Sequence, residues 1–133
     1  MRFVSLILSA LLGCTATAAQ AELPEGARVA SWAAKGETTC LLPLAAARAG
    51  LVHIPINPLL KRAQVSHILA DSGAEMLIGT RARLGTLEPG DAPALCRLLD
   101  EEECWHETEK LGGDLGPSSR DPDELAAILY TSG

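Results

Sequence analysis

Short apolar runs of strand length recur along the middle of the chain. Residues 28–32 (R-V-A-S-W) alternate between polar and apolar positions, and residues 51–56 form an apolar run that only one histidine interrupts. This run stops at Asn57 and Pro58, where proline forces a turn, and a third run begins at residues 75–78. Because runs of this length bounded by turn residues are typical of buried strands, the pattern predicts three strands.

Helical spacing separates these runs. The first predicted helix is capped by Thr38 or Thr39 and ends at Gly50, and the second covers residues 61–72 and ends at Gly73, since glycine suits a helix C-terminus. Strands that alternate with helices through short connections favour a parallel sheet with right-handed crossovers. The predicted fold class is therefore a layered α/β fold built on a parallel sheet.

The periodicity weakens beyond residue 80. Residues 81–87 fit a short helix, residues 94–99 fit a further strand, and residues 112–122 indicate a loop rich in glycine, proline and serine. Residues 100–103 are all acidic. A short acidic run is most often a solvated surface, so we assign it no function.

The chain finishes on an apolar segment, residues 125–130, followed by Thr131, Ser132 and Gly133. A strand that leads into hydroxyl residues and glycine suits a phosphate-binding loop, because glycine lets backbone N–H groups approach an anion and hydroxyls add donors. An ordinary turn after a strand uses the same residues. The motif by itself does not distinguish these two interpretations.

Residues 1–21 have the pattern of a secretory signal. Arg2 supplies a positive charge, residues 4–13 form an apolar run, and the small residues Ala19 and Ala21 offer a cleavage site. The apolar run is too short to span a bilayer. The alternative is an ordinary helix that packs ahead of the first strand, and both interpretations stay open.

Composition and charge exclude some functions. The chain has 133 residues, 47% of them hydrophobic, which is enough to bury one core. Its formal charge of -6 repels phosphate backbones, and its 11 basic residues form no stripe, so we expect no nucleic-acid binding.

Metal and nucleophile chemistry have little support in the sequence. The cysteines form no C-x-x-C pair and have no spacing typical of a metal site, so we predict ordinary thiols at Cys14, Cys40, Cys96 and Cys104 and no metal centre. His53 and His67 lie among apolar neighbours and are interpreted as core or surface histidines. No catalytic residue can be assigned from spacing.

Three segments, taken in order, resemble the adenylate-forming superfamily, which includes acyl-CoA synthetases and the adenylation domains of peptide synthetases. Residues 45–58 (A-A-A-R-A-G-L-V-H-I-P-I-N-P) and 63–78 (A-Q-V-S-H-I-L-A-D-S-G-A-E-M-L-I) are similar to two of its core motifs. Residues 123–133 (D-E-L-A-A-I-L-Y-T-S-G) are similar to the start of its phosphate loop, Y-T-S-G-T-T-G-x-P-K-G. The stretch P-I-N-P-L-L-K-R-A-Q-V resembles, more narrowly, the acyl-CoA ligases associated with exosortase systems.

The resemblance implies that residues 22–133 are part of an AMP-binding domain and form an incomplete parallel-sheet subdomain. It also implies an enzyme that activates a carboxylic acid with ATP and Mg²⁺ to an acyl-adenylate, then passes the acyl group to CoA or another thiol in the cytoplasm. Thr131, Ser132 and Gly133 would open the loop that contacts the ATP phosphates, and Tyr130 would lie in the strand beneath it.

The rest of the loop and the later parts of the family pattern do not follow Gly133. We therefore expect the chain to be inactive alone and to bind ATP poorly. Two other hypotheses stay open. One is a small exported binding or accessory protein with a cleaved signal, and the other is a scaffold piece that associates through an exposed sheet edge.

Overall fold

A parallel four-stranded sheet forms the centre of the protein. The computed structural model describes residues 23–110 and 118–131. The strands are β1 (Arg28–Trp32), β2 (Val52–Pro55), β3 (Met76–Gly79) and β4 (Arg97–Asp100), and all three neighbouring pairs in the order β2-β1-β3-β4 are parallel. The predicted parallel α/β fold is confirmed. The strand predicted at residues 94–99 begins later than expected, at Arg97.

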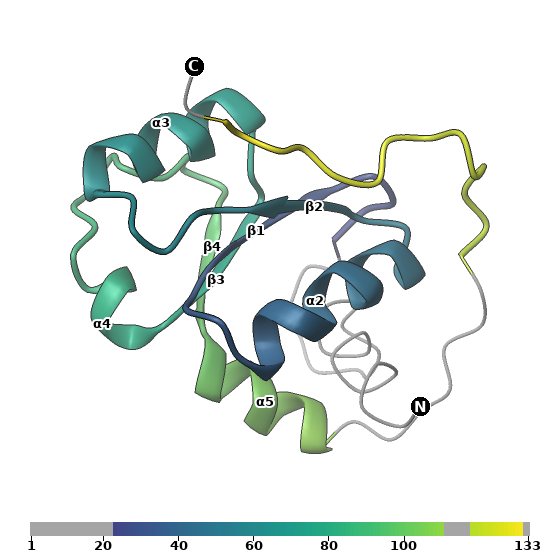
Figure 1. Ribbon diagram of the computed structural model, residues 1–133, viewed down its shortest axis with the longest axis horizontal. Coiled ribbons are helices and arrows are strands. Elements are labelled where there is room, and N and C mark those ends of the chain that lie inside the picture. Colours follow the sequence, from purple (N-terminus) through teal and green to yellow (C-terminus); the bar gives the residue numbers. More distant parts are fainter. Residues whose placement is uncertain (1–22, 111–117, 132–133) are drawn as a thin grey trace.

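Helices cover both faces of this sheet (Figure 1). They are α2 (Glu37–Arg48), α3 (Arg62–Ser72), α4 (Arg81–Leu84) and α5 (Glu101–Lys110). α2 and α5 pack on one face, and α3 packs on the other face with Leu84 at the end of α4. This gives three layers with two separate cores, as a parallel sheet requires.

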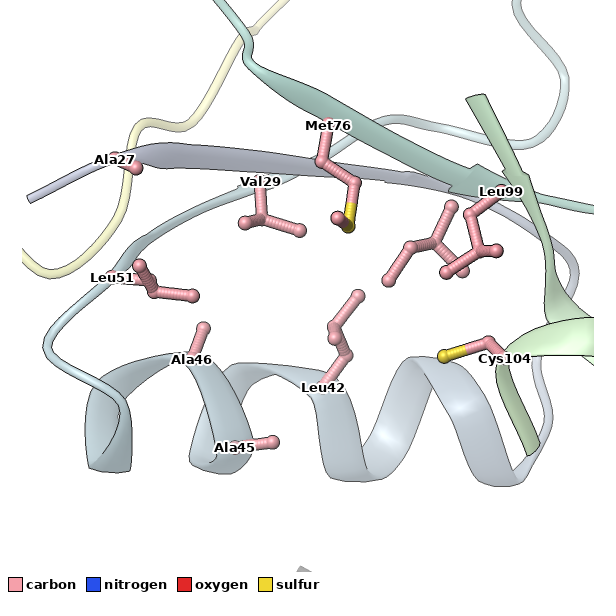
Figure 2. Close-up of a cluster of buried hydrophobic side chains, with 10 residues drawn as sticks. Ala27, Val29, Leu42, Ala45, Ala46, Leu51, Met76, Leu99 and Cys104 are labelled. Atoms are coloured by element: carbon pink, nitrogen blue, oxygen red, sulfur yellow. The ribbon is translucent and has the colours of Figure 1, made fainter. Parts of the chain in front are cut away.

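The first core lies between the sheet and α2 (Figure 2). Leu42 and Ala46 of α2 point toward Val29 of β1, and Met76 and Leu99 bring in β3 and β4. The members of this core are buried: Ala27, Val29, Leu42, Ala45, Ala46, Leu51, Met76, Ile78, Leu99 and Cys104.

The second core lies on the opposite face. It joins side chains of three strands to side chains of α3. Its buried members are Ala30, Trp32, Ile54, Ile56, Val65, Ile68, Leu69, Ala74 and Leu77. Gly73 ends α3 with φ 63°, a left-handed conformation that glycine adopts without strain, as the sequence predicted.

Two predicted boundaries need correction. Neither Thr38 nor Thr39 caps α2, because the helix begins earlier, at Glu37, with Gly36 before it. The Thr39 hydroxyl instead accepts a hydrogen bond from the Gly36 N–H at 3.0 Å. The helix predicted over residues 81–87 is only the four-residue α4, after which Gly85 begins a loop.

The acidic run begins a helix. Glu102 and Glu103 are exposed, as the predicted solvated surface requires, but Asp100 is not. Asp100 is only 8% exposed, and its Oδ1 accepts hydrogen bonds from the backbone N–H groups of Glu102 (3.0 Å) and Glu103 (3.4 Å). These bonds satisfy N–H groups that have no partner within a helix, so Asp100 acts as the N-cap of α5. The inner face of α5 then carries Cys104 into the first core and brings Trp105 against it.

His53 lies inside the sheet layer, with its side chain 4% exposed. Its Nε2 is 3.0 Å from the Ser31 hydroxyl oxygen, within hydrogen-bonding distance. Burial lowers the pKa of His53 from 6.5 to about 4, because the charged imidazolium loses its hydration there. The side chain is therefore neutral at pH 7, which supports the interpretation as a core histidine.

The capping role of Asp100 predicts a selective loss of stability. Asp100→Ala should lower the free energy of unfolding by about 1 kcal/mol, because the two N–H groups lose their acceptor. Asp100→Asn keeps a side-chain oxygen and should retain most of that stability. Urea denaturation followed by tryptophan fluorescence measures both variants, and an equal loss in the two would contradict the capping assignment.

The burial of His53 predicts a loss of stability on acidification. The unfolded chain takes up its proton near pH 6.5 and the folded chain only near pH 4, so stability present above pH 6.5 is lost as the pH falls toward 4. The loss should be on the order of 3 kcal/mol. His53→Gln should remove this part of the pH dependence, measured by urea denaturation from pH 7 to pH 4.

His67, which is exposed, provides the matched control. His67→Gln should leave the acid-dependent loss of stability unchanged. The same pH dependence in both variants would show that burial of His53 is not its cause.

Candidate functional site

The last described segment of the chain lies alongside β2, as the yellow trace in Figure 1 shows. The His53 N–H donates to the Ala126 carbonyl at 2.9 Å, and the Ile128 N–H donates to the His53 carbonyl at 3.0 Å. These bonds make a single parallel bridge between His53 and Ala127. The prediction of a strand over all of residues 125–130 is therefore wrong. The two backbone hydrogen bonds make one bridge with β2 and do not continue as a ladder.

Side chains near residue 120 anchor the beginning of this segment. Arg120 Nη1 donates to the carbonyl oxygens of Gly50 and Leu125, each at 3.2 Å. The Ser119 hydroxyl donates to the Glu25 carboxylate at 3.0 Å. The segment is thus tied to the loops at the amino ends of β1 and β2 before it runs along the sheet.

Tyr130 anchors the other end of the segment. Its hydroxyl donates to the Asp71 Oδ2 of α3 at 2.6 Å, and its ring packs with Ile128 against the second core. Burial raises the pKa of Tyr130, and the hydrogen bond to the negative Asp71 raises it further. The sequence predicted that Tyr130 would lie in a strand. In the structure Tyr130 lies outside any strand and follows the single bridge.

Thr131 lies at the edge of an open groove of about 490 Å³. The groove runs along α3 beside the end of β2, and its lining residues are Asn57, Leu60, Ala63, Gln64, His67, Ile68, Tyr130 and Thr131. Ser132 and Gly133, the other two predicted loop residues, lie outside the described residues. The structure therefore places one of the three predicted site residues, and it places that residue beside a groove.

The groove brings together residues that the sequence did not identify as a site. Asn57 follows β2 at its carboxyl end, where open parallel sheets bind ligands. Gln64 and His67 are three residues apart, a spacing that puts both on one face of α3. Both signals were present in the sequence, but only the fold shows that Thr131 lies beside them.

The groove can donate hydrogen bonds but carries little positive charge. Its described lining offers a threonine hydroxyl, two amides and an imidazole, and none of the described lining residues is lysine or arginine. These groups fit hydrogen bonding to one phosphate group. The negative charge of a triphosphate must be balanced by cations, and the described lining residues do not supply them.

The described thiols do not form a second site. Cys40, Cys96 and Cys104 are free, and burial raises the pKa of both Cys96 and Cys104 to about 11. Cys14 lies outside the described residues. Within residues 23–110 and 118–131, no three metal-binding side chains gather into a cluster, and no helix is long and apolar enough to cross a membrane.

Comparisons with known proteins match nearly the whole chain. A family described as AMP-binding enzyme matches residues 16–133. An L-proline–L-prolyl-carrier protein ligase of Pseudomonas fluorescens is 34% identical over 114 residues, which cover 82% of this chain and 23% of the relative. The fatty acid–acyl-carrier-protein ligase ScoC of Streptomyces coeruleorubidus is 33% identical over 115 residues, which cover 85% of this chain and 22% of the relative.

Solved structures share the fold at lower identity. The N-terminal domain of FACL13 from Mycobacterium tuberculosis superposes with a TM-score of 0.85 at 23% identity, covering 98% of this chain and 33% of that chain. The long-chain-fatty-acid-CoA ligase FadD1 from Archaeoglobus fulgidus gives a TM-score of 0.83 at 18% identity. The match covers 99% of this chain and 26% of that chain. At this identity the likeness shows the fold alone.

This chain spans less than a quarter of the length of these two curated relatives. The comparisons do not confirm the narrower resemblance to exosortase-associated ligases, and they give no support to a small exported binding protein.

Proposed function

The chain belongs to the AMP-binding enzyme family of adenylate-forming ligases, and we propose on this basis that it is part of an AMP-forming acid–thiol ligase. Such an enzyme joins a carboxylate to the α-phosphate of ATP with release of pyrophosphate, and a thiol then displaces AMP to form a thioester. The thiol would belong to CoA or to a carrier protein, and the cytoplasm would supply ATP and CoA.

The position of Thr131 is the observation that carries this proposal. Thr131 directly follows a segment that is paired with β2 and tied to α3, and it lies at a groove beside the carboxyl end of β2. Parallel sheets bind ligands at this edge. We assign Thr131, Ser132 and Gly133 to the opening of the loop that contacts the ATP phosphates.

Adenylation needs more than this groove supplies. The triphosphate must be held in line with the attacking carboxylate while negative charge develops, which requires donors and positive charge. The residues that the structure places around the groove provide donors, and there is no lysine or arginine among them. Mg²⁺ and basic side chains of a longer chain would therefore supply the charge, and the present 133 residues alone would be inactive.

The proposal predicts where activity resides. The purified 133-residue chain, supplied with ATP, Mg²⁺, CoA and a panel of carboxylic acids, should release no pyrophosphate and form no thioester. The same chain joined in frame to the remainder of the L-proline ligase relative should release pyrophosphate when L-proline, the acid in that relative's name, is added. Thioester formation by the 133-residue chain would contradict the proposal.

A substitution in the joined enzyme tests the loop assignment. Thr131→Ala should raise the KM for ATP by about tenfold or more, because one hydrogen bond to a charged phosphate is lost. Thr86→Ala is the matched control, since the Thr86 hydroxyl is exposed and donates to the Arg83 carbonyl at 2.7 Å in a loop that does not line the groove. An unchanged KM in Thr131→Ala would contradict the assignment.

A further inference from the structure

A side-chain hydrogen bond from Tyr130 to Asp71 ties the end of the described chain to α3, close to Ser72 at the end of that helix. The Tyr130 hydroxyl donates to Asp71 Oδ2 at 2.6 Å, a short distance typical of a bond to a charged acceptor. Tyr130 directly precedes Thr131. Whatever fixes Tyr130 therefore also limits where Thr131 lies.

The backbone provides less restraint at this point. Within the described residues, Ile128 is the last to form a backbone hydrogen bond with β2. The next residue, Leu129, has its side chain 71% exposed. Between that last backbone bond and Thr131, the contacts of Tyr130 are what hold the chain to the protein.

α3, which accepts this bond, is itself fixed at both ends. Arg28 of β1 donates to the Ser72 carbonyl at the end of α3. Arg62 at its beginning pairs with Asp91 at 2.5 Å and with Glu88 at 2.6 Å. The helix is therefore held to the rest of the protein at both of its ends.

α3 also forms one wall of the groove. Gln64, His67 and Ile68 line it from this helix, and Thr131 lines it from the segment. A bond from Tyr130 to α3 thus limits the distance across the groove between Thr131 and α3.

We propose that Asp71 and Tyr130 are positioning residues, whose hydrogen bond holds Thr131 against α3 and so places the start of the phosphate loop at the groove. This inference rests on the proposed function for the role of the loop. The contact itself can be tested without any ligase activity.

Tyr130 is the only tyrosine among the 133 residues, so its phenol can be titrated directly by absorbance in the intact chain. The wild-type phenol should lose its proton at a higher pH than free tyrosine, because burial and then Asp71 raise its pKa. Asp71→Ala should move the titration back toward free tyrosine. Asp71→Asn, which keeps an acceptor but loses the charge, should fall between the two.

Because Thr131 lines the same groove as His67 and Ile68, we expect NMR contacts from the Thr131 methyl group to these two side chains in the wild-type chain, and their presence measures positioning. Tyr130→Phe, which keeps the packed ring and removes only the hydroxyl, should abolish these contacts, and so should Asp71→Ala. Asp71→Asn should preserve them. Ser119→Ala is the matched control, because it breaks a bond of the same segment to Glu25, away from the groove, and should leave the contacts intact.

Contacts that persist in Tyr130→Phe, or a wild-type phenol that titrates like free tyrosine, would overturn the inference. Loss of the contacts in Ser119→Ala as well would show a general loosening of the segment and would overturn it too. Neither measurement uses ATP, so an inactive joined enzyme would refute the proposed function and leave the positioning result standing.

Discussion

Burial of a parallel sheet on both faces is the constraint from which the rest of this structure follows. Val29 and Ala30, neighbours in the inner strand β1, are both fully buried, yet they belong to different cores on opposite faces. Such a strand needs a helical layer on each side. α2 and α3 supply these layers, and each connects one strand to the next in the chain.

The same constraint decides what the sequence could predict. Strands buried on both faces are often continuous apolar runs, so residues 51–56 and 75–78 were recognisable. Residues 28–32 were recognised by their alternation, and the second helix by its stop at Gly73. α5 was missed because half of its residues are acidic. Cys104 and Trp105 are its only apolar residues, and the buried Thr108 is polar, so the sequence shows no apolar helical spacing.

The candidate site was harder to predict, for a different reason. The apolar residues 125–130 suggested a strand, but pairing depends on a partner, and β2 gives this segment one bridge at His53. The groove then combines Asn57 and side chains of α3, among them Gln64 and His67, with Thr131, which is far from them in sequence. Their proximity is a property of the fold, so a motif could indicate Thr131 and could not indicate its neighbours.

The central claim is that residues 131–133 begin an ATP phosphate loop. A crystal structure of the joined ligase with a non-hydrolysable ATP analogue tests this most directly. Phosphate oxygens should then lie within about 3 Å of donors on Thr131 and Ser132, beside the groove along α3. Phosphates bound elsewhere, with Thr131 facing solvent, would contradict it.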